Sequence, residues 1–288
     1  MSYVRAKPAV PVAGEPLVRR LLRYASGFGV RDFVLNLHYL PETIAARVGD
    51  GSDLDVRVRY SFESPVLGSA GGPRKALSLL PDNPFFIING DTLTNVDLDA
   101  IAESHRRSGA LVTIAVTPND KPERYGGLIL DSTGRFHSVV PRGSRVRSYH
   151  VVGVQVAHPS AFARLPVNEP AESIGALYKD LVKENPGHVR AFLCDADFWD
   201  VGTPVDYLNA CLSIRAIEGQ ASEIGGGSSV DPSAQMTDCV VWDDVKVGPE
   251  ATLERCILAD AVEIPAGASF RNCAIIQRNG ELTVTDIT

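Results

Sequence analysis

Apolar and polar positions along residues 1–215 form runs that change between the period of a strand and the period of a helix. Short apolar runs bounded by turn residues predict buried strands, and apolar residues three and four apart predict helices that bury one face. This alternation is typical of a layered α/β domain. Strands are expected at residues 33–37, 56–62, 85–88 and 111–116, shorter strands and turns over 127–157, and helices at 17–25, 41–48, 74–80, 97–107 and 204–218.

The C-terminal part of the chain repeats with a period of 17 residues. Three blocks that begin at Val230, Val247 and Ile264 align without a gap, after a stretch that contains Gly225-Gly226-Gly227. Apolar positions six apart within each block predict the stacked rungs of a parallel β-helix. The other matched positions are Ala234, Ala251 and Ala268; Met236, Leu253 and Phe270; and Cys239, Cys256 and Cys273. We therefore expect an α/β domain over residues 1–220, a Gly/Ser linker over 221–229 and a β-helix of about three rungs over 230–288.

The three cysteines of the repeat admit two interpretations. Metal ligands must converge on one point, whereas one position of a repeat places its side chains in a row along the axis of the β-helix. A ladder of small buried thiols is therefore favoured over a metal site. None of the five cysteines belongs to a Cys-x-x-Cys pair, so free thiols in a reducing cytoplasm are expected.

Charge and composition narrow the class of partner. A net charge of −7 argues against a surface for nucleic acid or acidic membranes. No apolar stretch has the length of a membrane span, and no leader sequence opens the chain, so no membrane partner is expected. An anionic small molecule would need a local basic pocket. Candidates for such a pocket, or for ordinary solvated surface, are Arg5 with Lys7, and Arg142 with Arg145 and Arg147.

Two aspartates stand at positions suited to a metal ion. Asp91 follows the apolar run 85–88, at the carboxyl edge where open α/β sheets bind ligands, and Gly90 allows the backbone to approach a nucleotide. Asp200 precedes a helix that begins with Pro204. Each aspartate could equally cap or turn the chain into the helix that follows, so position alone leaves both interpretations open.

A glycine-rich turn at residues 68–72 precedes a helix that carries Arg74 and Lys75. Such a turn can expose backbone amides to a base or a phosphate, although it also fits an ordinary connection from strand to helix. Transfer of a nucleotidyl group to a phosphate needs positioning and charge neutralisation, because the attacking oxygen is already anionic. The two aspartates and the turn together fit that chemistry.

Several segments, in one order, resemble the sugar-1-phosphate nucleotidyltransferases, a family with mannose-1-phosphate guanylyltransferase-like and glucose-1-phosphate nucleotidyltransferase-like members. The resemblance implies a Rossmann-like α/β domain with a mixed, mainly parallel sheet, followed by a short left-handed parallel β-helix of hexapeptide repeats. Each rung here is one residue short of three hexapeptides. The matching segments are Lys7-Pro8 within 6–17, the turn 68–71, Asn89-Gly90-Asp91, Tyr125-Gly126-Gly127, Gly153, and Trp199-Asp200-Val201-Gly202-Thr203.

The resemblance also implies a role for each matching residue. Asp91 and Asp200 would hold Mg²⁺ between the α-phosphate of a nucleoside triphosphate (NTP) and the phosphate of a sugar 1-phosphate, and Lys7 would neutralise phosphate charge. The sugar phosphate would attack the α-phosphorus in line and expel pyrophosphate. The implied nucleotide-binding residues are Gly68, Ser69, Ala70, Gly71, Asn89 and Gly90, and the implied sugar-phosphate-binding residues are Tyr125, Gly126, Arg142, Gly153 and Glu172.

The sequence departs from the family pattern in two places. The family opens with an apolar strand and a Gly-Thr-Arg loop that holds the triphosphate, whereas this sequence starts at Met1-Ser2-Tyr3, past that loop. The loss of one strong electrostatic contact costs about 10²–10³ in rate. The family also has Glu-Lys-Pro after a Gly-Arg turn, and here Pro141-Arg142-Gly143 takes that place. Arg142 can serve as a phosphate clamp, but the sugar-binding carboxylate is absent.

Three candidate functions are compatible with these sequence features to different degrees. The first is a cytoplasmic enzyme that makes a nucleoside diphosphate (NDP) sugar. The second, suggested by the two departures, is a non-catalytic nucleotide-sugar-binding or regulatory subunit with the same fold. The third is acyl transfer by the β-helix, which three rungs and the lack of a histidine after His188 argue against, because that chemistry needs a base. We favour a homo-oligomer contact through the β-helix over acyl transfer.

Overall fold

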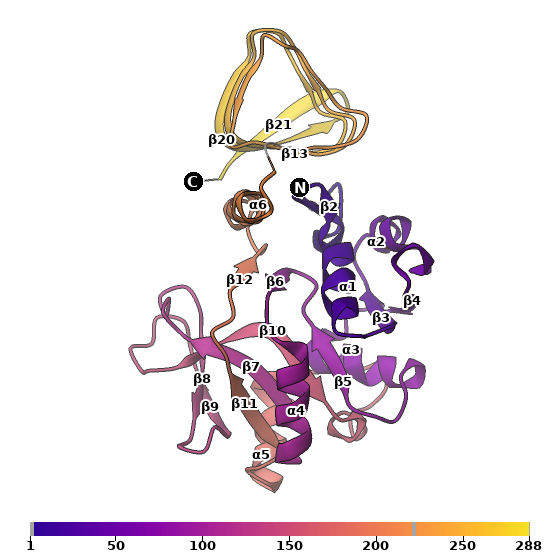
Figure 1. Ribbon diagram of the computed structural model, residues 1–288, viewed down its shortest axis with the longest axis vertical. Helices are drawn as coiled ribbons and strands as arrows, with labels where there is room; N and C mark the ends of the chain where they lie inside the picture. The colour runs from indigo at the N-terminus through magenta and orange to yellow at the C-terminus, as the bar shows by residue number, and fades with distance from the viewer. Residues whose placement is uncertain (1–2, 221–222, 288) are drawn as a thin grey trace. The chain divides into compact units, whose positions relative to one another are not determined.

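The computed structural model describes residues 3–220 and 223–287, which form two compact units (Figure 1). The sheet unit comprises Leu21–Pro41 and Val48–Phe198, and the β-helix unit comprises Met1–Arg20, Glu42–Arg47 and Trp199–Thr288. Residues 221 and 222 of the expected linker lie outside the described residues. The division at residues 220 and 230 therefore stays a proposal. The elements α1 (Leu17–Gly27), α2 (Pro41–Val48) and β12 (Phe198–Asp200) run from one unit into the other.

The sheet unit contains a mixed sheet with the strand order β11-β7-β10-β8-β9, in which β5 also pairs with β10. Strand β11 runs parallel to β7, and the other pairs of this sheet are antiparallel. A separate parallel pair joins β3 and β4. The bounds are β3 (Asp32–Leu37), β4 (Arg57–Phe62), β5 (Phe85–Ile88), β6 (Thr92–Thr94), β7 (Val112–Pro118), β8 (Gly127–Leu130), β9 (Phe136–Val140), β10 (Tyr149–Ala157) and β11 (Val189–Leu193).

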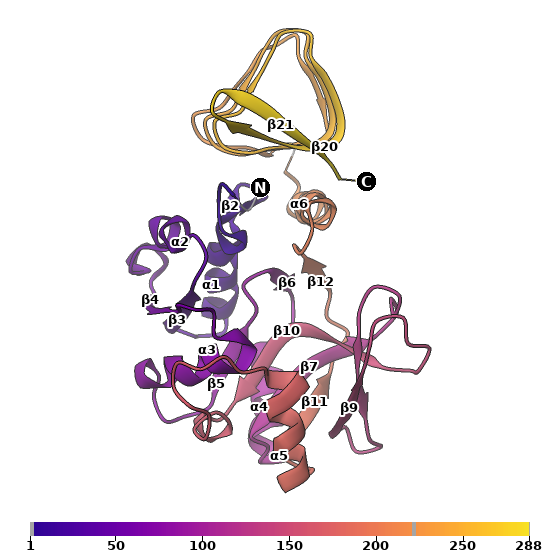
Figure 2. The ribbon, with the colours of Figure 1, turned by 180° about the vertical axis from the view of Figure 1, so that it is seen from behind.

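Helices cover both faces of the mixed sheet. Helix α4 stands in front of the sheet in Figure 1, and α5 stands in front of it in the opposite view of Figure 2. No described helix is both long enough and apolar enough to cross a membrane. The helices of this unit are α3 (Gly68–Ala76), α4 (Leu98–Ser108) and α5 (Tyr178–Glu184), with short helical turns η2 (Ser52–Leu54), η3 (Leu77–Leu79), η4 (Pro159–Ala161) and η5 (Ser173–Leu177).

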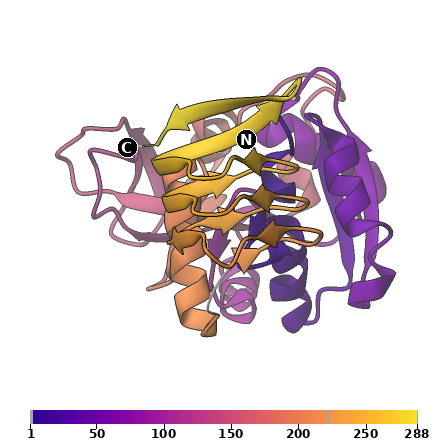
Figure 3. The same ribbon diagram turned by 90° about the horizontal axis from the view of Figure 1, so that it is seen from above.

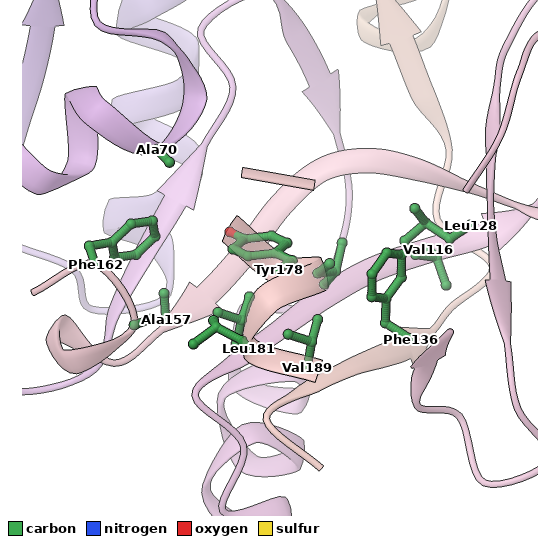
Figure 4. Close-up of a cluster of buried hydrophobic side chains, with 12 residues drawn as sticks. Ala70, Val116, Leu128, Phe136, Ala157, Phe162, Tyr178, Leu181 and Val189 are labelled. Carbon is green, nitrogen blue, oxygen red and sulfur yellow. The ribbon is translucent and has the colours of Figure 1, made fainter. Parts of the chain in front are cut away.

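Alternation along β7 explains the two layers, because successive side chains of a strand point to opposite faces. Val112, Ile114 and Val116 pack in the core with Tyr178 and Leu181 of α5 (Figure 4). On the other face, a second core contains Ala115 of β7, Leu98 and Ile101 of α4, and three valines of β10, namely Val152, Val154 and Val156. The mixed sheet is therefore buried on both sides.

The structure differs from the expected elements in two places. The helix expected at residues 74–80 begins at Gly68, so the glycine-rich stretch is its first turn rather than a loop. Ala70 in this turn is fully buried, and its N–H donates to Ala171 O at 2.9 Å. This long-range contact outweighs the low helix propensity of glycine. Helix α5 and strand β11 were not anticipated.

The β-helix unit confirms the 17-residue period. Met236 pairs with Leu253, and Leu253 pairs with Phe270, in parallel register. Figure 3 shows the rungs stacked on one another, and β21 closes the stack antiparallel to β20. The elements are η1 (Lys7–Ala9), β1 (Pro11–Val12), β2 (Glu15–Pro16), α6 (Pro204–Glu218), β13 (Glu223–Ile224), β14 (Ser229–Val230), β15 (Gln235–Thr237), β16 (Val240–Val241), β17 (Lys246–Val247), β18 (Thr252–Leu258), β19 (Glu263–Ile264), β20 (Ser269–Arg278) and β21 (Glu281–Asp286).

The repeated cysteines form the expected ladder of buried thiols. Cys239, Cys256 and Cys273 are buried in the core of the β-helix, and the sulfurs of Cys256 and Cys273 lie 3.7 Å apart. All five cysteines are free thiols. Within residues 3–220 and 223–287, no three His, Cys, Asp or Glu side chains gather as a metal site.

The β-helix core predicts a large cost for Leu253→Ala. Leu253 is 1% exposed between Met236 and Phe270, so truncation leaves a cavity and should lower the free energy of unfolding by about 2–5 kcal/mol. Its neighbour Thr252 is exposed, and Thr252→Ala should change stability by less than about 0.5 kcal/mol. Chemical denaturation followed by the fluorescence of buried Trp242 measures both. Equal losses for the two variants would contradict the assigned core.

Candidate functional site

Strand β10 sets the geometry of the candidate site. Its partner β7 follows one edge of β10, pairing with both of its ends. Strands β5 and β8 must therefore share the opposite edge, where Ile88 pairs with Val154 and Leu128 pairs with Tyr149. Because β5 ends and β8 begins beside residues 150–153, the segments 89–91 and 125–126 flank the same short stretch of β10.

Gly153 lies within this stretch, inside β10. Its φ is +84°, a conformation that favours glycine, and the register with β7 shifts between Val151 and Gln155. The N–H of Asn89 donates to Gly153 O at 2.8 Å. A Cβ at Gly153 would lie 3.3 Å from the Cβ of Asn89. Gly153 therefore brings the backbone of β10 against the segment that carries Asp91.

Neither candidate aspartate caps the helix that follows it. Asp91 leads into β6, and the N-cap of α4 is Asp97, whose carboxylate accepts from Ala100 N at 2.9 Å. The N-cap of α6 is Thr203. Asp200 does turn the chain, because its Oδ1 accepts from Gly202 N at 2.8 Å.

Lys7 is held at the turn that contains Asp200. Its Nζ donates to Gly202 O at 3.1 Å, across 195 residues of sequence. A Cβ at Gly202 would lie only 3.0 Å from Asp200 Oδ1, so the close turn depends on glycine there. The β-helix unit therefore brings the exposed side chain of Lys7 to the turn that contains Asp200.

The glycine-rich turn packs against residues 169–173, which include Glu172. The N–H groups of Ala70 and Gly71 both donate to Ala171 O, at 2.9 and 3.3 Å, and both residues are buried. Gly68 and Ser69 are exposed, and Ser69 Oγ lies 3.5 Å from Glu172 Oε2. Of the four residues expected to present backbone groups to a base, Gly68 and Ser69 are thus the accessible ones. Ala70 and Gly71 use their amides to hold the turn.

Glu63 supports this turn, and sequence reasoning missed it. Its side chain is buried, with Oε1 accepting from Asn36 Nδ2 at 2.7 Å and Oε2 accepting from Leu67 N at 2.8 Å. A Cβ at Gly72 would lie 2.6 Å from Glu63 Oε1. The available signal was a carboxylate directly after a strand of alternating polar and apolar residues, five residues before Gly68.

Aromatic rings lie on the side of the site where β8 begins. The ring centroid of His150 lies 4.3 Å from that of Tyr125 and 4.5 Å from that of Phe198. A Cβ at Gly126 would lie 2.9 Å from Val140 O and 3.6 Å from Arg142 N, so these backbones are close. Arg142 itself is exposed. His150 and Phe198 join the predicted Tyr125, Gly126 and Arg142 here.

The thiol of Cys194, at the end of β11, is not activated. Cys194 follows β11, and burial raises the pKa of its thiol, with smaller opposing effects from backbone hydrogen bonds to Ala196 and Val116. A thiol with a raised pKa is a weak nucleophile at neutral pH.

Two family models match this chain. The model of the nucleotidyl transferase family matches residues 1–216, and a model described as GlmU-like, C-terminal hexapeptide matches residues 210–271. The chain belongs to the nucleotidyl transferase family. The predicted fold class, an α/β domain with a mixed sheet followed by a left-handed β-helix, is confirmed. Antiparallel pairs outnumber parallel ones in the mixed sheet of the α/β domain. Parallel pairs predominate in the β-helix of this nucleotidyl transferase.

Characterised relatives of this nucleotidyl transferase include sugar-phosphate enzymes. A mannose-1-phosphate guanyltransferase of Aspergillus oryzae is 27% identical over 260 residues, covering 82% of this chain and 69% of the relative. A mannose-1-phosphate guanylyltransferase of Mycobacterium tuberculosis is 25% identical, covering 84% and 75%. A UTP–glucose-1-phosphate uridylyltransferase of Synechocystis is 27% identical, covering 86% and 68%.

Solved structures share the fold of this nucleotidyl transferase. HddC from Yersinia pseudotuberculosis is 26% identical with a TM-score of 0.63, covering 72% of this chain and 89% of HddC, and it has also been solved complexed with GMP-PN. A structure from Bacillus anthracis has a TM-score of 0.66 at 17% identity, covering 74% and 88%, which is a likeness of fold alone.

The packing of the glycine-rich turn predicts strain in Gly68→Ala. The φ of Gly68 is +73°, and the new Cβ would lie 2.9 Å from Ala171 O, so the contact with residues 169–173 should open at a cost of about 1–3 kcal/mol. Gly175→Ala is the control, because nothing lies within 4 Å of a Cβ there. Thermal unfolding and hydrogen exchange of residues 67–72 measure the difference. Equal unfolding temperatures and equal exchange rates in the two variants would show that the turn tolerates a side chain at residue 68.

Proposed function

We propose that this nucleotidyl transferase joins the nucleoside monophosphate of an NTP to a sugar 1-phosphate. An oxygen of the sugar phosphate attacks the α-phosphorus, the bond to the β-phosphate oxygen breaks, and pyrophosphate leaves. The attacking oxygen is already anionic, so the protein needs to position and neutralise phosphates rather than remove a proton. The products are an NDP-sugar and pyrophosphate.

The contact between Lys7 and the Asp200 turn carries this proposal. A cation 3.1 Å from Gly202 O, next to an aspartate, is an arrangement suited to a polyphosphate and its metal ion. The named relatives support the acceptor, because they act on mannose 1-phosphate or glucose 1-phosphate. Asp91 belongs to the other unit, at the end of β5. Its pairing with Asp200 on one metal ion is part of the proposal.

The donor chemistry of the two aspartates fits Mg²⁺. Both are carboxylates with part of the side chain exposed, and Mg²⁺ is usually bound by one or two carboxylates together with substrate phosphates. Asp91 and Asp200 would hold the ion, which when bound would neutralise charge on the phosphates. A loosely hydrated cation such as Ca²⁺ should substitute poorly, because it prefers more ligands at longer distances.

The remaining residues divide between the two substrates. Gly68 and Ser69, with Asn89 and Gly90, would face the nucleotide, since they are the accessible parts of their segments. Tyr125, Gly126, Arg142, Gly153 and Glu172 would face the sugar phosphate, with Arg142 as its cation. The relatives differ in base and sugar, so the substrate pair requires a panel that includes GTP with mannose 1-phosphate and UTP with glucose 1-phosphate.

One other assignment depends on the same panel, and a second needs a separate measurement. A folded chain that binds an NDP-sugar but releases no pyrophosphate from any pair would favour the regulatory subunit considered from the sequence. Self-association through the β-helix is a separate proposal, and light scattering of the purified chain over a range of concentrations decides it.

Removing either proposed metal ligand should abolish most turnover. Asp91→Asn and Asp200→Asn keep the side-chain volume but lose the charge that binds Mg²⁺, so pyrophosphate release should fall by about 10²–10³-fold. The measurement is pyrophosphate release against Mg²⁺ concentration at saturating substrates. Asp99→Asn, in the exposed first turn of α4, is the control and should retain activity. Turnover in either active-site variant equal to that of the control would contradict the metal assignment.

A further inference from the structure

Arg5 is buried in the β-helix unit, although it lies in the N-terminal segment. It is 3% exposed, and its guanidinium donates from Nε to Asp260 Oδ2 at 2.7 Å and from Nη2 to Asp243 Oδ2 at 2.7 Å. A further bond from Nη2 to Asp260 Oδ1 makes the pairing with Asp260 bidentate. Bidentate pairs of arginine with carboxylate are among the strongest and most directional contacts of a protein.

The two carboxylates belong to the repeat of the β-helix. Asp243 and Asp260 are 17 residues apart, so they occupy the same position on successive rungs. Like charges at equivalent turns of neighbouring rungs repel, and two stacked aspartates would destabilise the β-helix on their own. Arg5 supplies the compensating charge from outside the repeat. The acidic pair therefore gives the β-helix a specific attachment for the N-terminal segment.

Other contacts anchor the same segment on the far side of Lys7. Trp242 is fully buried, and its Nε1 donates to the hydroxyl of Tyr207 in α6 at 2.8 Å. That hydroxyl in turn donates to Pro11 O at 2.5 Å. The guanidinium of Arg5 also lies 5.2 Å from the ring centroid of Trp242, within the range of a cation–π contact. Arg5 and Pro11, on the two sides of Lys7, are thus both attached to the rung that carries Trp242 and Asp243. Arg5 is attached directly, and Pro11 is attached through Tyr207.

The surrounding charges keep the attachment ionised. Burial acts to raise the pKa of Asp243, but the hydrogen bond and charge of Arg5, together with Arg47 at 3.0 Å, hold that pKa below its usual value. Arg47 comes from α2, whose residue Thr43 accepts a hydrogen bond from Ala6 N at 3.1 Å. The backbone that leads from Arg5 to Lys7 is therefore fixed as well.

We propose that Arg5, clamped by Asp243 and Asp260, is a positioning residue that holds Lys7 at the Asp200 turn. The β-helix would then act as part of the phosphate-binding machinery through its first two rungs, beyond any role in assembly. The catalytic part of this inference rests on the proposed function, since Lys7 is assigned to phosphate there. The positional part concerns only Lys7 and Gly202, and it can be tested without turnover.

The main variant is R5M/D243N/D260N, which neutralises Arg5 and both carboxylates. Arg47, the other partner of Asp243, keeps its charge, but 37% of its side chain is exposed to solvent. The matched control is K246M/E263Q, which removes an exposed ion pair of 2.6 Å between the same two rungs. R5K is the conservative variant, because lysine keeps the positive charge but lacks the planar guanidinium that makes the bidentate contact with Asp260. If the triple variant does not fold, as judged by circular dichroism, R5K carries the same measurements.

The first measurement is independent of catalysis. Limited acetylation with acetic anhydride, followed by peptide mass spectrometry, measures the rate at which the Lys7 amine reacts. Hydrogen exchange measures the exchange rates of the Ala9 and Val10 amides. We expect the acetylation rate and the exchange rates to rise in the triple variant, to rise less in R5K and to stay at the wild-type level in K246M/E263Q. Unchanged rates in a folded triple variant or in a folded R5K overturn the proposal.

The second measurement separates positioning from general destabilisation. With the panel's best substrates, kcat should fall by about 10–10²-fold in the triple variant, as expected for a misplaced catalytic group, with a KM change within about twofold. In a Lys7→Met background the same three substitutions should no longer lower kcat, because the residue they position is gone. An equal loss of kcat in both backgrounds overturns the proposal. If the wild type releases no pyrophosphate, the proposed function fails, and the reactivity of Lys7 still decides the positional claim.

Discussion

Strand β10 has two edges but three neighbouring strands, and the sheet unit depends on how they share them. Because β7 takes one edge, β5 must stop before β8 can begin on the other. A left-handed glycine, Gly153, lies in the interval and accepts a hydrogen bond from Asn89 N. The end of β5, with Asp91, and the loop before β8, with Tyr125, are therefore brought to the same stretch of backbone. Strand pairing therefore brings together two of the segments that carry candidate site residues.

The β-helix unit meets a different constraint, which is to hold a long N-terminal segment that contains few strands of its own. An acidic pair holds this segment. Asp243 and Asp260 occupy equivalent positions of the 17-residue repeat, so they stack wherever the rungs stack. A stacked acidic pair is unfavourable without a cation beside it, so the two carboxylates bind the guanidinium of Arg5 strongly. Lys7, two residues further on, then reaches Gly202 O. The repeat thereby connects the β-helix with the Asp200 turn.

Local patterns in the sequence predicted much of this structure, and long-range contacts account for what they missed. The 17-residue period set the register of Leu253 with Met236 and Phe270, because each rung repeats the same local choice. The start of α3 at Gly68 depends on Ala171, about a hundred residues away, and no local pattern encodes it. Buried Glu63 and Arg5 look like surface charges in sequence, since their partners Asn36, Asp243 and Asp260 are distant. The candidate aspartates were found because they follow strands or precede helices at recognisable turns.

The central proposal is that Asp91 and Asp200 bind one metal ion during nucleotidyl transfer. Anomalous diffraction from crystals grown with Mn²⁺ and the NDP-sugar product tests it most directly, because Mn²⁺ replaces Mg²⁺ at oxygen ligands and its position can be identified. The account predicts an anomalous peak within about 2.0–2.2 Å of a carboxylate oxygen of each aspartate and of a product phosphate. Metal bound to only one aspartate, or product bound away from both, would contradict it.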